Sequence, residues 1–162
     1  MNIYLIGMMG SGKSTIGKMV AQKMRLPFID LDLEIENFAG KPINEIFKKY
    51  SEEFFRKIES ECLKIRSNSI LACGGGIVSK NENISYINKH GKTILLTAPL
   101  SELYQRLSGT NNRPLLKNGN IKQTLERLWL ERKSKYIDMA DLTINTSNRS
   151  PKDISIEIVE SI

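Results

Sequence analysis

Residues 7–14 read Gly7-Met8-Met9-Gly10-Ser11-Gly12-Lys13-Ser14, between a short apolar run, Ile3 to Ile6, and a segment with helical periodicity. This spacing matches G-x-x-x-x-G-K-[ST], the loop that wraps a polyphosphate between a strand and a helix. In such a loop, backbone N–H groups point at the phosphates, the lysine reaches the outer phosphates and the hydroxyl contacts a magnesium ion. The stretch therefore predicts a nucleotide-phosphate site, with a flexible glycine turn as the alternative interpretation.

Strand and helix patterns alternate along the rest of the chain. Short apolar runs predict strands, and apolar residues spaced three and four apart predict helices. The predicted strands cover residues 3–6, 27–32, 69–73, 92–97 and 142–145. The predicted helices cover residues 16–25, 33–40, 43–65, 79–89, 100–107, 121–136 and a closing segment from about 151. This alternation predicts an α/β fold in which helices cover both faces of a parallel sheet.

Length and composition limit the class of protein. The chain has 162 residues, 40% hydrophobic and 26% charged, which is ordinary for a soluble globular protein. We expect one domain over residues 1–162, because this length leaves no room for a second full core. No apolar run approaches the ~20 residues that span a bilayer, so no membrane partner is expected. The net charge is +6, but the basic residues are scattered, so nucleic acid is not an expected partner either.

Several reactive residue types have structural interpretations. The two cysteines, Cys62 and Cys73, lack metal-ligand spacing and are expected to be small core residues of a reduced protein. With no signal peptide in the sequence, this predicts a cytoplasmic protein. The single histidine, His90, stands before Gly91 at the end of a predicted helix, opposite the expected active edge. It is expected to be a surface residue at a helix terminus.

Two carboxylates, Asp30 and Asp32, stand at the end of the predicted strand 27–32. Ligands bind at the carboxyl ends of strands in open parallel sheets, so these acids are expected beside the phosphate loop. There, one carboxylate can order the water shell of magnesium while the other accepts a hydroxyl proton. The alternative is a pair of solvated loop acids. Three glycines, Gly74 to Gly76, follow the next strand and predict a close approach of the backbone to another group.

Three arginines are candidates for anion binding. Arg132 falls in the middle of the apolar stripe of helix 121–136, so it must either pair with a carboxylate or bind an anion. Arg56 falls off the apolar face of the predicted helix 43–65, and periodicity alone predicts a solvated side chain. Arg113 lies in a polar, poorly periodic segment that is typical of a mobile lid. It is either a contact to the transferred phosphate or an ordinary loop arginine.

Taken together, these features resemble shikimate kinase, a family of small P-loop kinases with a nucleoside-monophosphate-kinase-like fold, over essentially the whole chain. The motifs that carry the resemblance are GMMGSGKST, FIDLDLEIE, GKPINEIF, FRKIE, CGGG, NRPLL, RKSKY with the following AD, and NRSP. The resemblance implies a three-layer fold whose five-stranded parallel sheet has the order 2-3-1-4-5, with a mobile lid at about 109–120. It implies transfer of the ATP γ-phosphoryl group to the 3-hydroxyl of shikimate, in aromatic amino-acid (chorismate) biosynthesis.

The resemblance also implies roles for individual residues. In the substrate-binding region at about 32–60, Asp32 is the base on the substrate hydroxyl and Arg56 joins Arg132 in gripping the shikimate carboxylate. The backbone of Gly74, Gly75 and Gly76, chiefly Gly75, lies against the ring. Asp30 holds Mg2+ through water, and Ser14 contacts it directly. The residues assigned to ATP are Gly10, Ser11, Gly12, Lys13, Ser14, Thr15, Arg113 and Arg149, with Lys13 and Arg113 also catalytic.

One residue departs from the family pattern. Ser51 stands where the family usually has a glycine before its Phe-Arg motif. If that position required positive φ, serine would cost about 1 kcal/mol. The alternatives to a shikimate kinase are a kinase for another hydroxy acid such as gluconate or for a nucleoside monophosphate, and a non-catalytic nucleotide-binding protein. A monomer is expected.

Overall fold

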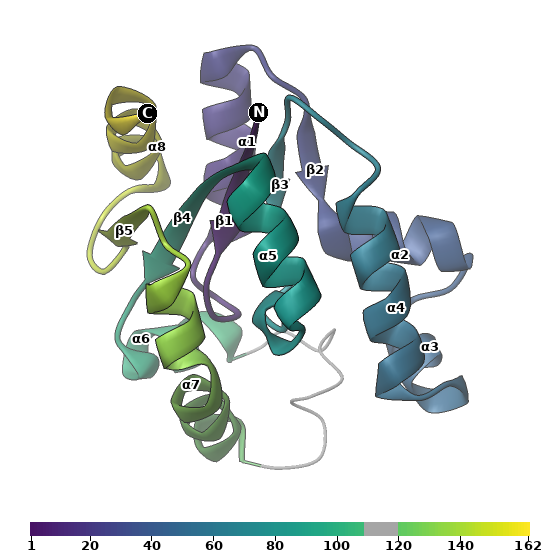
Figure 1. Cartoon of the computed structure of the whole chain (residues 1–162). Helices are drawn as coiled ribbons and strands as arrows, with labels where there is room; N and C mark the ends of the chain where they lie inside the picture. Colours follow the sequence, from purple (N-terminus) through teal and green to yellow (C-terminus); the bar gives the residue numbers. More distant parts are fainter. Residues whose placement is uncertain (109–119) are drawn as a thin grey trace.

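The sheet is parallel and has five strands. The structure is a computed structural model that describes residues 1–108 and 120–162. Its strands are β1 (Asn2–Ile6), β2 (Phe28–Asp30), β3 (Ile70–Ala72), β4 (Gly91–Thr97) and β5 (Leu142–Asn145). They lie in the order β2-β3-β1-β4-β5, as the family resemblance implied, and every neighbouring pair is parallel (Figure 1). All carboxyl ends therefore meet at one edge of the sheet.

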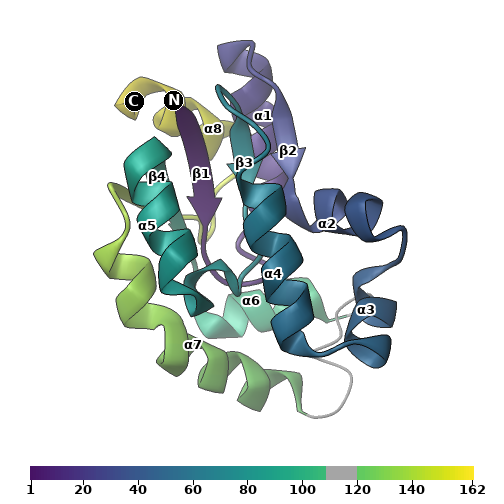
Figure 2. The same ribbon diagram turned by 45° about the vertical axis from the view of Figure 1, so that its right-hand side comes forward.

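Helices cover both faces of this sheet. They are α1 (Lys13–Met24), α2 (Leu31–Ala39), α3 (Ile43–Lys49), α4 (Glu52–Leu63), α5 (Asn81–His90), α6 (Leu100–Leu107), α7 (Ile121–Asp138) and α8 (Pro151–Ser161). A short 3-10 helix, Ile77–Ser79, precedes α5. In Figure 2, α4 and α5 lie in front of the sheet, α1 and α8 lie behind it, and α7 crosses its lower edge. Within the described ranges, no helix is long and apolar enough to cross a membrane.

Alternate residues of β1 build two separate cores. Ile3 and Leu5 are buried with apolar residues of α1 and α8 on one face. Tyr4 and Ile6 are buried on the other face with residues of α4, α5 and α7. Because side chains of a strand alternate between faces, a central parallel strand must be apolar at every position, and this one is buried throughout. The two cores hold the loops at the carboxyl edge in fixed positions.

The predicted helix 43–65 is in fact two helices. Helix α3 ends at Lys49, and α4 begins at Glu52 with Ser51 as its N-cap. Ser51 has φ −75° and its hydroxyl accepts a hydrogen bond from Phe54 N at 3.3 Å. The positive φ that would penalise serine is therefore absent, and serine is a favourable cap at this position.

The predicted strand 27–32 is shorter than expected. Strand β2 ends at Asp30, and α2 begins directly at Leu31. Asp30 is the N-cap of this helix, because its Oδ1 accepts a hydrogen bond from Asp32 N at 3.2 Å. Asp32 consequently lies in the first helical turn, where the helix dipole stabilises a negative charge.

The structure confirms the predicted positions of several other residues. The bounds of α6 and β5 match the predicted residues 100–107 and 142–145. Cys62 and Cys73 are buried free thiols. His90 is exposed at the end of α5, and its Nδ1 lies 2.7 Å from Tyr86 O. Because β4 begins at Gly91, this histidine lies at the edge of the sheet opposite the strand ends.

Candidate active site

The phosphate loop connects β1 to α1 in a conformation that only glycines adopt easily. Gly7, Gly10 and Gly12 have φ of 134°, 81° and 94°. A Cβ on Gly7 would also overlap Leu96 O of the neighbouring strand β4. Helix α1 begins at Lys13 with no side-chain cap, so its first N–H groups stay directed at the loop. Such an uncapped helix start is suited to binding phosphate.

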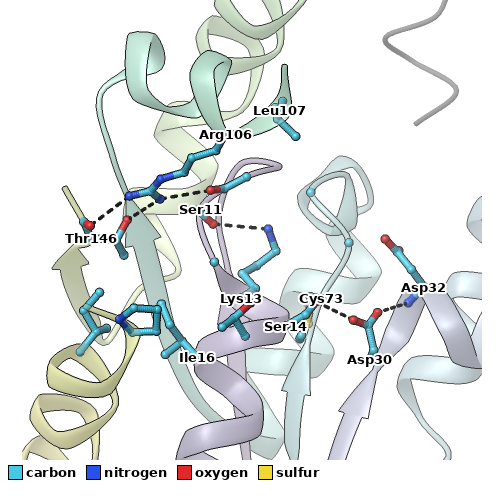
Figure 3. Close-up of a pocket in the computed structure, with 18 of the residues that line it drawn as sticks. Ser11, Lys13, Ser14, Ile16, Asp30, Asp32, Cys73, Arg106, Leu107 and Thr146 are labelled. Carbon is cyan, nitrogen blue, oxygen red and sulfur yellow. Dashed lines mark hydrogen bonds between the residues drawn. The ribbon is translucent and has the colours of Figure 1, made fainter. Parts of the chain in front are cut away.

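Lys13 lies on the loop itself. Its ammonium donates hydrogen bonds to Gly7 O at 2.9 Å and to Met8 O at 2.8 Å. Figure 3 shows this side chain between Ser11 on one side and the acids on the other. The two carbonyl groups therefore hold the flexible Lys13 side chain so that its positive charge lies at the centre of the site.

A cavity of about 460 Å³ runs along the carboxyl edge of the sheet. Its central wall is formed by the loop residues Gly10 to Thr15, and Asp30, Asp32, Gly74 and Gly75 line one end. Arg106, Thr146 and Arg149 line the other end. In Figure 3, Arg106 and Thr146 stand opposite Asp30 and Asp32, with Lys13 between them. An elongated ligand can therefore lie with its middle on the loop.

Ser14 and Asp30 bring two oxygen ligands together beside the loop. The Ser14 hydroxyl donates a hydrogen bond to Asp30 Oδ2 at 2.5 Å. Oxygen ligands of this kind suit Mg2+, which keeps several waters and takes its remaining ligands from phosphates. The described ranges contain no group of three or more His, Cys, Asp or Glu side chains that could hold a metal.

Gly74 and Gly76 are required for space rather than for backbone conformation, and Gly75 between them leaves room for a Cβ. None of them has a positive φ. A Cβ on Gly74 would lie 2.8 Å from Asp32 Oδ1 and 3.3 Å from Glu59 Oε1, and a Cβ on Gly76 would overlap the Arg56 guanidinium. Gly75 lies over the phosphate loop, with Gly7 O and Met9 N 3.6 Å from its Cβ position. This confirms the predicted close approach and places the phosphate loop, Asp32 and Arg56 around one short segment.

Arg56 is buried, so the prediction of a solvated side chain was wrong. It is 6% exposed and pairs with Glu59 at 2.9 Å and with Glu52 at 3.1 Å. The prediction assumed a single helix over residues 43–65 with one apolar face. In the structure α4 is a separate helix, and it has buried residues on more than one side. Burial lowers the pKa of Arg56, but the two carboxylates outweigh burial and leave the pKa raised. The guanidinium is therefore a permanent buried cation.

Glu59 is a site residue that sequence reasoning missed. It is fully buried, and both of its oxygens accept hydrogen bonds from Arg56 Nη1. Burial raises the pKa of Glu59, while the adjacent guanidinium opposes this rise. The sequence could have indicated this pair, because Glu59 follows Arg56 by three positions and residues with this spacing are neighbours on a helix surface.

Arg132 is buried in α7 as predicted, with 8% exposure. Its Nη1 donates a hydrogen bond to Gly75 O at 3.1 Å, and the Tyr136 hydroxyl donates to the same oxygen. Across residues 1–108 and 120–162, Arg132 has no ion pair within 4.0 Å. Arg132 therefore holds the carbonyl of the glycine segment in place from helix α7.

Arg106 at the far end of the cavity was also missed. Its Nη1 donates to Gly10 O at 3.2 Å and to Thr146 Oγ1 at 3.1 Å, and its Nη2 donates to Thr146 O at 3.1 Å. Arg149 lies at the same end and pairs with Glu157 at 2.5 Å. Arg113 and nearly all of the predicted lid at 109–120 lie outside the described residues.

Comparison with known proteins identifies the family. The family model described as shikimate kinase matches residues 9–162. The shikimate kinase of Rippkaea orientalis is 44% identical, covering 99% of this chain and 87% of that protein. That of Geobacter sulfurreducens is 41% identical, covering 97% of this chain and 88% of that protein. The structure of shikimate kinase from Acinetobacter baumannii in complex with shikimate aligns with TM-score 0.95 and 35% identity, covering 99% and 91% of the two chains.

Two further solved structures align with this chain, and the one with the lower identity shares only its fold. Deoxyadenosine kinase from M. mycoides aligns with TM-score 0.63 at 16% identity, covering all of both chains. Shikimate kinase from Aquifex aeolicus aligns with TM-score 0.85 at 34% identity, covering 99% of this chain and 95% of that one. The family model and the similar relatives span nearly the whole sequence, so this chain belongs to the shikimate kinase family.

Proposed function

We propose that this protein transfers the γ-phosphoryl group of ATP to the 3-hydroxyl of shikimate, a step of aromatic amino-acid biosynthesis. The observation that carries the proposal is the cavity, which joins a phosphate loop to Asp32, Gly74 and Gly75. Arg132 contacts Gly75 O and Arg56 lies against Gly76, so both arginines border the glycine segment without lining this cavity. The family and a relative solved with shikimate support the choice of acceptor.

The nucleotide would lie along the loop. Backbone N–H groups of residues 10–15 would hold the β-phosphate at the start of α1. Lys13 would exchange the carbonyl oxygens of Gly7 and Met8 for phosphate oxygens, since both are acceptors for the same ammonium. Arg106 and Arg149 line the end of the cavity where the base would lie, and the predicted contact of Arg149 with adenine would be made there.

Ser14 and Asp30 would hold Mg2+, Ser14 directly and Asp30 through water. When bound, the ion neutralises charge on the β- and γ-phosphates. The hydroxyl–carboxylate contact keeps both side chains at the edge of the cavity in the absence of ligand. Asp30 also caps α2, so the same residue fixes the backbone of Asp32.

The acceptor would lie between the glycines and the two arginines. Its carboxylate would bind Arg56 and Arg132, and its ring would lie against Gly74, Gly75 and Gly76. Asp32 would accept the proton of the attacking hydroxyl, because its carboxylate lies directly beside Gly74 at the end of the cavity that the loop reaches. The protein would contribute mainly positioning and charge neutralisation, which dominate phosphoryl transfer.

Three further assignments stay predictions. Arg113 would contact the transferred phosphoryl group from the segment at about 109–120, as the family pattern implies. A monomeric protein made of one domain is expected, and the two buried free thiols support the expected cytoplasmic location.

A coupled ADP-release assay tests the proposal against its rivals. The protein is incubated with ATP and Mg2+ and with shikimate, gluconate or AMP as the only acceptor. We expect fast ADP release only when shikimate is the acceptor, because the buried side chains of Arg56 and Arg132 suit one small carboxylate. Equal release with gluconate or AMP would favour the rival kinases. Release that no acceptor increases would contradict the proposal.

A further inference from the structure

The guanidinium of Arg56 is held by two carboxylates with different exposure. Glu59 is buried and binds Nη1 through both oxygens, at 3.1 and 2.9 Å. Glu52 binds the opposite edge, where its Oε1 lies 3.3 Å from Nε and 3.1 Å from Nη2. The Glu52 side chain is 59% exposed, against 1% for Glu59. One carboxylate is thus a fixed structural partner, and the other is a surface side chain.

The Nε–Nη2 edge is the one that a ligand can take most easily. A carboxylate binds arginine best through two parallel N–H groups. Taking Nη1 would separate the buried pair with Glu59, which is strongly destabilising. The guanidinium is also held against Gly76, whose Cβ position lies 2.6 Å from Arg56 Cζ. An incoming carboxylate therefore meets an edge that Glu52 already occupies.

We propose that Glu52 is an internal stand-in for the carboxylate of the acceptor and that the acceptor displaces it on binding. The inference rests on the proposed function, in which Arg56 binds the shikimate carboxylate. Glu52 then acts as a specificity-determining residue. A carboxylate ligand replaces one ion pair with another, whereas a neutral acceptor of the same shape cannot displace Glu52.

The surroundings give the displaced side chain a place to go. Glu52 lines a second cavity of about 290 Å³ together with Arg127, Glu131, Arg132 and Lys135 of α7. Three of these four charged side chains are cations, and Arg127 pairs with Glu131 at 2.8 Å. A released Glu52 carboxylate would therefore remain near positive charge and water. Its displacement requires no carboxylate to be buried without a partner.

The test compares E52Q with E53Q. Both glutamates are in the first turn of α4, so both variants lose the same net charge and the same interaction with the helix dipole. Of these two glutamates, only Glu52 has a hydrogen bond to the Arg56 guanidinium among the described residues. We expect E52Q to lower KM for shikimate about two- to fivefold, the factor that an exposed ion pair is worth, with kcat and KM for ATP unchanged. E53Q should match the wild-type protein.

A binding titration separates affinity from turnover. Trp129 is the single tryptophan and lies three residues from Arg132, so its fluorescence can report shikimate binding. The dissociation constant should fall in E52Q and fall further in E52A, which removes the remaining acceptor oxygen. An unchanged or raised KM in E52Q would overturn the inference, and so would an equal fall in E53Q, which would indicate a general charge effect.

The same measurements distinguish this inference from the proposed function. If the wild-type protein shows no shikimate-dependent ADP release, the proposed function fails and the inference fails with it. If the wild-type protein is active but E52Q and E53Q behave alike, only the role of Glu52 is overturned.

Discussion

Replacing Gly76 with alanine should weaken phosphorylation of shikimate far more than binding of ATP. Gly76 has φ −93°, so its backbone accepts alanine without strain. The added Cβ would lie 2.6 Å from Arg56 Cζ, and the three nearest atoms all belong to that guanidinium. The guanidinium must move by more than 0.8 Å, because ordinary contact is 3.4 Å or more and both of its Nη atoms lie nearer to the added Cβ than Cζ does.

The magnitude follows from the hydrogen bonds that such a shift breaks. A hydrogen bond to a charged group contributes about 1.5–3 kcal/mol, and a shifted Arg56 would lose one or two such bonds to the acceptor carboxylate. A loss of about 3 kcal/mol corresponds to roughly a 150-fold fall in kcat/KM for shikimate. We expect KM for ATP to stay within about twofold, because the phosphate loop lies beside Gly75 rather than Gly76.

The assay is steady-state ADP release at varied shikimate, with urea unfolding as a check on the fold. The control repeats the substitution in an R56A/E59Q background, which removes both the overlapping side chain and its buried counter-charge. If the clash with Arg56 is the cause, G76A should have no further effect on the free energy of unfolding in that background. A kcat/KM for shikimate within threefold of wild type in G76A alone would show that the added Cβ does not displace Arg56 from the acceptor.

Three other changes test separate parts of the site. D32N should remove most activity while the urea midpoint changes little, since Asp32 would accept the hydroxyl proton; a near-normal kcat would end its assignment as the base. R113A should lower kcat far more than ATP affinity, because the contact would strengthen in the transition state, and an unchanged kcat would refute that role. Burial raises the pKa of Tyr136 to about 12, above its usual value near 10, so its contribution to stability is complete below pH 10 and is lost as the pH rises toward 12. Urea unfolding should therefore show a smaller stability loss between pH 10 and 12 in Y136F than in wild type, and equal losses would contradict this.

Local patterns were sufficient to predict the phosphate loop and most of the elements, apart from the break in helix 43–65 and the early end of strand 27–32. The glycine spacing of residues 7–14 requires backbone conformations that the structure shows at Gly7, Gly10 and Gly12. Arg132 could be identified as special because a charge on an apolar stripe needs a partner whatever the rest of the fold is. Asp30 and Asp32 were expected beside the loop because the carboxyl ends of parallel strands share one edge.

Long-range contacts explain what sequence reasoning could not find. Periodicity gives one apolar face for a helix, whereas Arg56 is buried by the glycine segment and by Glu59. Arg106 reaches the cavity through a contact with Gly10, which is 96 positions away in the sequence and whose carbonyl oxygen lies 3.2 Å from Arg106 Nη1. The break between α3 and α4 depends on Ser51 as the N-cap of α4. A single serine in a polar stretch is too weak a signal to predict the start of a helix.

The phosphate loop and the glycine segment beside Arg56 and Arg132 are proposed to serve one reaction. Phosphorus NMR of a mixture of protein, ATP, Mg2+ and shikimate can detect its product, with R132A as the matched variant. We expect a phosphate monoester on the 3-hydroxyl of shikimate, formed in step with ADP and greatly slowed by the substitution. ADP accompanied only by inorganic phosphate, or an equal yield of the ester from R132A, would show that the two sites do not act together.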